Sequence, residues 1–367
     1  MLDPDKKIVA VRSLRNKDHA TNIPPTVLTI DWNLGKRCNY DCSYCSDLIH
    51  DSVSPFIVLT DAIAAVDNLH SEALNKSKKI DWIFTGGEPF IDPSFMDLLS
   101  VVRSKSTTNQ IAVSSNGSLP LQTYLKSTEF ITNLTLTIHP ERSTEELQRT
   151  IRTIKELNNV QGLMLSVTVM FLAGSITSTT SILEELSSAG ISTILRKIRP
   201  PADAHHFESL EVSKKSRILV DTKRQIEIKL DTKKKHDLDT YNKERSYYTE
   251  LEHKFVDDLY NKNVPWNNMA VWYEDGSYSE VNSDELLVQN SHSFNSWICF
   301  AGVDSLYIDT DGSVYIGNCY NGGSIGNIKN KTEFKKHPVK CSLNWCTCNI
   351  DMTVRKASKT IYLKLIT

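Results

Sequence analysis

Apolar runs rich in Val, Ile, Leu and Thr alternate with amphipathic segments between residues 27 and 198 of this 367-residue chain. Short apolar runs that are bounded by turn residues predict buried strands. Segments with apolar residues three and four positions apart predict helices. The expected strands are 27–32, 80–85, 110–115, 134–139, 163–171 and 192–198, and the expected helices are 60–73, 93–104, 121–127, 144–157 and 179–189.

This alternation predicts an α/β fold. Strand–helix units in series pair their strands in parallel through right-handed crossovers, so six of them predict a partial (β/α)6 barrel of the TIM type. Barrels of this kind build their active sites at the carboxyl ends of the strands. We therefore expect the functional residues just after the predicted strands.

The remainder of the chain has a different pattern. Asp275-Gly276 and Asp311-Gly312 each lie between alternating apolar residues and predict β-hairpins. We expect an N-terminal arm (1–26), the barrel (27–200), a connecting or inserted region of uncertain fold (201–297) and a smaller C-terminal α+β hairpin domain (298–367).

Charge and hydropathy exclude some functions. With 42 Lys and Arg against 44 Asp and Glu, the formal net charge is −2, which favours neither nucleic acid nor a membrane surface. The apolar stretch 163–173 is too short to span a bilayer, and the N-terminus lacks the apolar region of a signal peptide. We expect a cytoplasmic protein without a membrane or nucleic-acid partner.

The eight cysteines occur in two groups, an arrangement that indicates metal ligation rather than disulfides. Cys38, Cys42 and Cys45 form a Cys-x3-Cys-x2-Cys triad. Three thiolates can bind three irons of a [4Fe–4S] cluster and leave the fourth iron open to a small molecule. The alternative is a zinc site, which needs a fourth nearby Cys or His, and His50 is the nearest candidate.

Further polar residues follow the expected strands. Gly86 and Gly87 allow a close backbone approach, and Glu88 offers a carboxylate to a cation. Ser115-Asn116-Gly117 ends the next strand. His139 either contacts a ligand or bonds to backbone, and Arg199 either binds a carboxylate or phosphate or faces solvent.

The triad and the Gly-Gly-Glu-Pro motif together resemble the radical S-adenosylmethionine (SAM) superfamily, over residues 27–200. The resemblance implies that the triad cysteines hold a [4Fe–4S] cluster whose open iron binds the amino and carboxylate groups of SAM. Thr137-Ile138-His139 departs from the Ser-Leu-Asp segment that is frequent in the family. The implied SAM contacts are Tyr44 near the adenine, Gly86, Gly87 and Glu88 at the methionine ammonium, and Ser115 and Asn116 at the ribose and carboxylate.

The resemblance also implies the chemistry. The reduced cluster passes one electron to SAM, and the resulting 5′-deoxyadenosyl radical removes a hydrogen atom from the substrate. An external one-electron reductant such as flavodoxin or ferredoxin would supply the electron.

Five C-terminal cysteines surround the second hairpin and resemble the twitch domain, the shortened relative of the SPASM domain. This resemblance implies an auxiliary [4Fe–4S] cluster, with zinc as the alternative. Six residues separate Gly312 from Cys319 where the family usually has four, and the five cysteines exceed the four positions of one cluster. Cys299 and Cys319 are preferred as ligands, then Cys346 and Cys348 over Cys341.

Three functions are compatible with these motifs. The first is a radical SAM enzyme, an oxidoreductase in class, that oxidises or rearranges a small molecule such as a sugar, nucleotide or aminocyclitol. The second is a maturase that modifies a ribosomally synthesised peptide, although residues 1–26 are shorter than the leader-recognition domain of many maturases. The third is a non-catalytic metal-binding scaffold, which the SAM motifs argue against.

Overall fold

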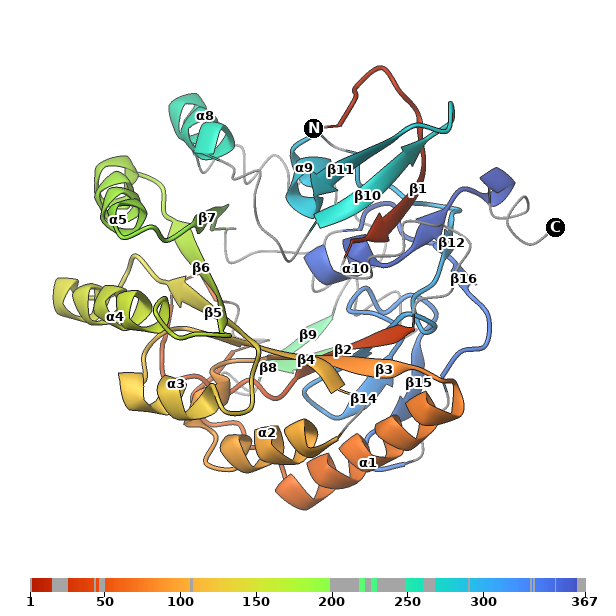
Figure 1. Ribbon diagram of the computed structural model, residues 1–367, viewed down its shortest axis with the longest axis horizontal. Coiled ribbons are helices and arrows are strands. Elements are labelled where there is room, and N and C mark those ends of the chain that lie inside the picture. Colours follow the sequence, from red (N-terminus) through yellow and green to blue (C-terminus); the bar gives the residue numbers. More distant parts are fainter. Residues whose placement is uncertain are drawn as a thin grey trace. The chain divides into compact units, whose positions relative to one another are not determined.

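The computed structural model (Figure 1) divides into two compact units that are discontinuous in sequence. Unit 1 comprises Met1–Asp31, Ala64–Asp81 and Lys262–Thr367, and unit 2 comprises Trp32–Ile63 and Trp82–Asn261. This division differs from the contiguous boundaries expected from the sequence. The structure describes residues 2–14, 26–42, 44–45, 50–105, 108–198, 218–221, 226–229, 248–259, 268–289, 291–330, 332, 334–346 and 348–361.

The strands of the barrel follow one another in the order β2-β3-β4-β5-β6-β7. The three pairings from β4 to β7 are parallel, as the repeated strand–helix pattern predicts. All six expected strands are confirmed. They are β2 (Val27–Asn33), β3 (Lys79–Thr85), β4 (Thr108–Ser115), β5 (Asn133–Ile138), β6 (Met164–Phe171) and β7 (Thr193–Lys197).

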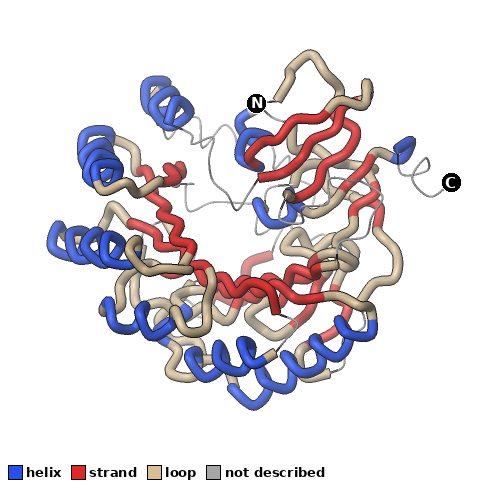
Figure 2. Tube along the Cα trace, viewed as in Figure 1, coloured by secondary structure: helices blue, strands red, loops and turns tan. Residues whose placement is uncertain are grey.

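The five expected helices are also confirmed, and together with the parallel strands they establish the α/β fold of a partial barrel. In unit 2, α2 to α5 follow the outer side of β4 to β7 (Figures 1 and 2). The helices are α1 (Leu59–Asn75), α2 (Phe95–Ser104), α3 (Leu121–Ser127), α4 (Thr144–Leu157) and α5 (Ile176–Ser188).

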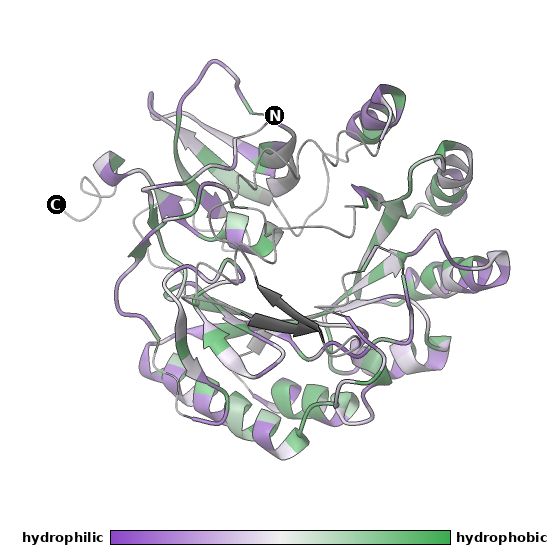
Figure 3. Cartoon of the chain, turned by 180° about the vertical axis from the view of Figure 1, so that it is seen from behind, coloured by the Kyte–Doolittle hydropathy of each residue, from purple (hydrophilic) through white to green (hydrophobic). Residues whose placement is uncertain are grey.

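Helix α4 shows how local sequence forms these elements. Ser143 caps its first turn, and the side chains and backbones of Ser143 and Glu146 bond reciprocally in a capping box. Ile151, Ile154 and Leu157 recur at helical spacing and are buried. Figure 3 shows the corresponding mixture of hydrophobic and hydrophilic residues along the helices of the unit.

A sixth helix, α8 (Glu250–Leu259), lies against β7 in unit 2. Tyr248 donates hydrogen bonds to the carbonyl oxygens of Phe171 and Ile198, and Lys197 forms an ion pair with Asp257 at 2.9 Å. Arg199 lies outside the described residues. The short strands β8 (Ile218–Asp221) and β9 (Ile226–Lys229) form an antiparallel pair.

Unit 1 contains a six-stranded sheet in the order β11-β10-β1-β17-β12-β16. Its first strand, β1, lies in the segment expected to be an N-terminal arm. The apolar run Ile8–Val11 explains the difference, because β1 is buried between β10 and β17. The strands are β1 (Ile8–Ser13), β10 (Asn268–Tyr273), β11 (Tyr278–Asn282), β12 (Ile298–Cys299), β16 (Val339–Lys340) and β17 (Lys356–Ala357).

Both predicted hairpins are confirmed. Gly276 (φ 83°) turns the chain between β10 and β11, and Gly312 (φ 77°) turns it between β13 and β14, conformations that glycine adopts without steric cost. The second hairpin is part of a sheet in which neighbouring strands follow the order β15-β14-β13-β2. The remaining elements of the unit are β13 (Ser305–Ile308), β14 (Ser313–Tyr315), β15 (Ser324–Asn327), α9 (Ser283–Val288) and α10 (Asn349–Thr353).

Candidate functional site

The cysteine triad lies in the loop that follows β2, and this loop is bonded to the end of β3. The Leu34 N–H donates to the Thr85 carbonyl at 2.9 Å, and the Gly87 N–H donates to the Gly35 carbonyl at 2.9 Å. The Glu88 N–H donates to the Arg37 carbonyl, also at 2.9 Å. The Gly-Gly-Glu segment therefore holds the start of the cysteine loop through its backbone.

Close packing against this loop explains both glycines of the motif. Gly86 has φ 142°, and a Cβ added to it would lie 2.8 Å from the Gly35 carbonyl oxygen. A Cβ on Gly87 would lie 2.1 Å from the Arg37 carbonyl oxygen, far inside van der Waals contact. The close approach that the sequence predicts occurs here with the protein's own backbone. A contact of either glycine with SAM stays a prediction.

The three triad cysteines come together with two tyrosines. Cys38 and Cys42 are buried in one cluster with Tyr40, and Tyr44 and Cys45 pack against it. The Cys45 N–H donates to the Cys42 carbonyl at 3.0 Å, and the Tyr40 N–H lies 3.4 Å from Cys38 Sγ. All three thiols are free of disulfides.

The Cys42 thiol is the most acidic of the three. A hydrogen bond from Cys45 lowers the pKa of Cys42 and outweighs the opposing effect of burial, and His139 lowers it further. The two sulfurs are therefore neighbours, and one of them is favoured as the thiolate, which is the ligand form.

His50 is the fourth ligand that the zinc alternative needs. Its Nε2 lies 2.5 Å from the Tyr40 carbonyl oxygen, and its buried Nδ1 has no hydrogen-bond partner among the described residues. Zinc at the triad therefore stays an alternative. Within the described ranges, no group of three His, Cys, Asp or Glu side chains forms a site for a single metal ion. Ligands of a [4Fe–4S] cluster bind different irons and surround the cluster instead.

Glu88 connects the end of β3 to the end of β4. Its buried carboxylate accepts hydrogen bonds from the Asn116 N–H at 2.7 Å, from the Phe90 N–H at 3.1 Å and from the Ser115 hydroxyl at 2.9 and 3.0 Å. Burial raises the pKa of Glu88 to about 7, although these donors act in the opposite direction. The expected partnership of Glu88 with a ligand ammonium stays a prediction.

The raised pKa of Glu88 predicts that the stability of the metal-free protein depends on pH. The folded state binds this proton more tightly than the unfolded state, whose pKa is near the ordinary 4.5. The free energy of unfolding should therefore fall by about 3 kcal/mol as the pH rises from about 4.5 to about 7. Glu88→Gln should remove this part of the dependence in urea unfolding measured at a series of pH values.

Glu184→Gln, at an exposed position of α5, is the matched control and should keep the wild-type dependence. An equally steep fall of stability in the Glu88→Gln protein would contradict the role given to this carboxyl group.

Asn116 joins the end of β4 to the cysteine loop. Its side-chain amide donates to Asn39 Oδ1 at 3.0 Å and lies 3.5 Å from Cys38 Sγ. Ser118 also bonds to Asn39, with 2.9 Å between Asn39 Nδ2 and Ser118 Oγ. The sequence pointed to Asn116 but missed Asn39 and Ser118, although both are direct neighbours of predicted site residues in the chain.

His139 follows β5 and reaches the same cluster. Its Nδ1 lies 2.5 Å from Tyr44 Oη and 3.5 Å from Cys42 Sγ. The ring stacks on Tyr44 with 6.1 Å between centroids and meets Tyr40 edge-on at 5.6 Å. The Nδ1 contacts are thus with side chains of the triad loop rather than with backbone. The Arg142 guanidinium, which sequence reasoning missed, lies 4.5 Å from the centre of the Tyr40 ring.

The five C-terminal cysteines lie in unit 1, around α10. Cys299, Cys341 and Cys346 belong to its apolar core. The Asp351 carboxylate accepts from the Cys319 N–H at 2.8 Å, and Asn318 Nδ2 lies 3.7 Å from Cys348 Sγ. This contact brings the loop after β14 to the start of α10.

The thiols of these five cysteines have different neighbouring groups. Burial raises the pKa of Cys319, and the nearby Asp351, Cys346 and Cys299 raise it further. Burial likewise raises the pKa of Cys348, with contributions from Asp351, Asp31 and Cys346. Cys341 Sγ instead points toward the Leu343 carbonyl oxygen, 3.9 Å away. Cys341 also lies near Cys299 and Cys346, so these contacts do not distinguish among Cys341, Cys346 and Cys348 as ligands.

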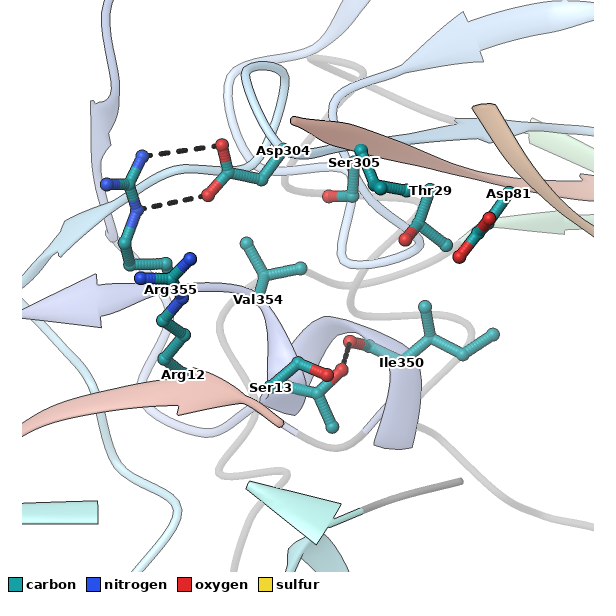
Figure 4. Close-up of a pocket in the computed structure, with 11 residues that line it drawn as sticks. Arg12, Ser13, Thr29, Asp81, Asp304, Ser305, Ile350, Val354 and Arg355 are labelled. Carbon is teal, nitrogen blue, oxygen red and sulfur yellow. Dashed lines mark hydrogen bonds and ion pairs between the residues drawn. The ribbon is translucent and has the colours of Figure 1, made fainter. Parts of the chain in front are cut away.

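Unit 1 also contains a pocket, which is lined in part by Ile350 and Thr353 of α10 (Figure 4). Arg355 and Asp304 line it and form a buried ion pair, with Arg355 Nε 3.1 Å from Asp304 Oδ2. Thr29, Asp81 and Arg12 are among its other lining residues. The pocket thus contains the Arg355–Asp304 ion pair together with a second arginine and a second aspartate.

Comparisons with known proteins give structural likenesses alone. No protein-family model matches the chain, and no curated protein matches it. The chain is similar to the structure of native anSMEcpe with bound AdoMet, at 16% identity and a TM-score of 0.48, over 83% of this chain and 79% of that one.

Two further structures are similar at lower identity. One is Streptococcus suis SuiB bound to the precursor peptide SuiA, at 14% identity and a TM-score of 0.45, over 84% of this chain and 64% of that chain. The other is BtrN in complex with AdoMet and 2-DOIA, at 12% identity and a TM-score of 0.37, over 83% of this chain and 80% of that chain. Among the helices described, none is long and apolar enough to cross a membrane.

Proposed function

We propose that this chain is a radical SAM enzyme that binds a [4Fe–4S] cluster through Cys38, Cys42 and Cys45. The observation that carries the proposal is the convergence of the three triad thiols, two of them buried, with side chains from the ends of successive strands. Asn116 from β4 and His139 from β5 both contact triad sulfurs. A cluster site at the carboxyl ends of barrel strands is where this fold places catalysis.

The donor set fits the group. Three thiolates bind three irons and leave one iron open, which a closed four-cysteine cluster would not do. When bound and reduced, the cluster supplies one electron to SAM, which yields methionine and a 5′-deoxyadenosyl radical that takes hydrogen from a substrate. The triad has no fourth cysteine within the loop that holds it.

The residues around the triad hold it in place and adjust its properties. Glu88 and the two glycines fix the loop against β3, so the three sulfurs keep their spacing. The Asn116 amide and the Tyr40 N–H approach Cys38 Sγ, and hydrogen bonds to ligand sulfurs raise the reduction potential of a cluster. Tyr40 and Tyr44 both pack against the His139 ring beside the triad.

The proposal includes an auxiliary [4Fe–4S] cluster in a twitch-like or SPASM-like C-terminal domain. Its ligands would be Cys299, Cys319, Cys346 and Cys348, with Cys341 as the extra thiol. Cys319 lies near Cys346 and Cys299, and Cys348 lies near Cys346, which supports this choice. The auxiliary cluster would accept an electron from the substrate radical or bind the substrate, which is a small molecule.

The test is reductive cleavage of SAM by the anaerobically reconstituted protein. With dithionite, or with flavodoxin or ferredoxin as the physiological class of reductant, the protein should form 5′-deoxyadenosine and methionine. Omitting the reductant should stop the reaction, because the sulfonium is cleaved only by an added electron. A protein that carries iron on the triad and forms no 5′-deoxyadenosine would contradict the proposal.

A further inference from the structure

Lys356 is a lysine in the interior of unit 1. Only 2% of its surface is exposed, and its strand β17 lies between β1 and β12. Its Nζ donates hydrogen bonds to the carbonyl oxygens of Asp351, of Met352 at 3.4 Å and of Val354 at 3.1 Å. Three donors that meet three carbonyls are the arrangement of a protonated ammonium. The side chain therefore carries a positive charge inside the protein.

Cysteines surround this charge. Cys299 is directly opposite Lys356 in the antiparallel pairing of β12 with β17, so the two side chains project from the same face of the sheet. Cys346, Asp351 and Cys319 also interact electrostatically with the ammonium. The ammonium thus lies among the thiols that we propose as auxiliary-cluster ligands.

The preceding residue shows the contrast between a paired and an unpaired cation. Arg355, which directly precedes β17, pairs with the Asp304 carboxylate. In the part of the chain that the structure describes, Lys356 has no such ion pair with a carboxylate. The nearby Asp351 carboxylate instead accepts from the Cys319 and Asn318 N–H groups.

Burying this cation is costly, because the ammonium has lost its hydration and, among the described residues, forms no ion pair with a carboxylate. The three carbonyl oxygens, the Phe294 ring (centroid 5.1 Å from Nζ) and the charge of Asp351 offset a part of this cost. A [4Fe–4S] cluster bound by four thiolates has a net negative charge. Such a cluster beside Cys299 would supply a further countercharge next to Lys356.

We propose that Lys356 is the counter-cation of the auxiliary cluster and that its charge raises the reduction potential of that cluster. The inference rests on the auxiliary cluster of the proposed function. One electron from an external reductant adds one negative charge to the cluster, so an adjacent ammonium stabilises the reduced state more than the oxidised state. At the effective dielectric of a protein interior, a unit charge a few ångströms away changes such an equilibrium by more than about tenfold.

The experiment measures the reduction potential of the auxiliary cluster alone. In the full chain with Cys38, Cys42 and Cys45 replaced by Ala, a dithionite titration followed by electron paramagnetic resonance reports only the C-terminal cluster. Adding Lys356→Met removes the charge and keeps an unbranched side chain. The equilibrium constant for one-electron reduction should fall at least about tenfold, which lowers the potential by about 59 mV.

Two further variants separate charge from structure. Lys78→Met removes another buried lysine of unit 1, which is paired with Asp304 at 3.6 Å, and should leave the potential unchanged. Lys356→Arg keeps the charge and should keep the potential close to that of the parent protein. If Lys356→Met prevents the cluster from assembling, retention of the cluster in Lys356→Arg still supports the role of the charge.

An intact cluster with an unchanged potential in Lys356→Met would overturn the inference alone. Loss of the cluster in both Lys356 variants, or an equal shift in Lys78→Met, would also overturn it, because the effect would then be structural. A parent protein without C-terminal iron would overturn both this inference and the auxiliary cluster. Cleavage of SAM by the chain with an intact triad would be unaffected by that result.

Discussion

Replacement of Cys38, Cys42 and Cys45 together by Ala is expected to reduce SAM cleavage to the level of a reaction without protein. The substitution removes all three thiols of the triad, and a [4Fe–4S] cluster cannot be held there without them. The C-terminal cysteines should still bind their cluster. Iron should therefore fall from about eight to about four per chain, and both quantities are measured on the same reconstituted samples.

Cys341→Ala is the control variant, because it removes a cysteine that is not a proposed cluster ligand. Its thiol hydrogen-bonds to the Leu343 carbonyl oxygen at 3.9 Å, and the proposed cluster already has four other cysteines, so this variant should keep SAM cleavage and both clusters. Undiminished cleavage by the triple variant would refute the assignment of the triad. Zinc in place of the remaining iron would refute the auxiliary cluster.

Gly87→Ala is expected to cause the second large effect, on stability and on cluster binding together. The new methyl group would lie 2.1 Å from the Arg37 carbonyl oxygen and 2.5 Å from its carbonyl carbon. These are backbone atoms that cannot rotate away, so the end of β3 and the cysteine loop must separate. We expect the free energy of unfolding to fall by about 3 kcal/mol and the triad to lose its iron.

Gly35→Ala is the matched control in the same loop. The nearest atom to its added Cβ is the Pro55 carbonyl oxygen at 3.9 Å, an ordinary van der Waals distance, so this variant should change the free energy of unfolding by less than about 1 kcal/mol. Urea unfolding of the metal-free proteins and iron analysis after reconstitution test both variants. Wild-type stability with full iron in Gly87→Ala would show that the close packing of this segment is not required.

The barrel, and the clustering of candidate site residues at its strand ends, could be predicted from the sequence because their determinants are local. Strand and helix periods are visible within a few residues, and each predicted strand of the barrel is present. The triad has a short, recognisable spacing, and strand ends in a parallel sheet lie at one edge. The sequence therefore predicts that Glu88, Asn116 and His139 lie near the triad.

The partners of these residues depended on contacts between distant parts of the chain. Glu88 has the side chain of a ligand-binding residue, yet its carboxylate accepts from Ser115 and Asn116. Gly87 could serve a ligand or a backbone neighbour, and only the approach of Arg37 distinguishes these uses. Local sequence cannot show which donor reaches a buried carboxylate, because that depends on the register of separate strands.

Unit 1 shows most clearly that local sequence does not reveal contacts between distant segments. Its two hairpins could be read from Asp-Gly turns, since a turn is determined by the residues within it. The insertion of β17 between β1 and β12 joins segments from both ends of the chain. This pairing places the Lys356 charge opposite Cys299. The sequence alone determined the elements and the residue types that can ligate iron, whereas the tertiary structure decided which side chains become neighbours, because burial and pairing across the chain are non-local.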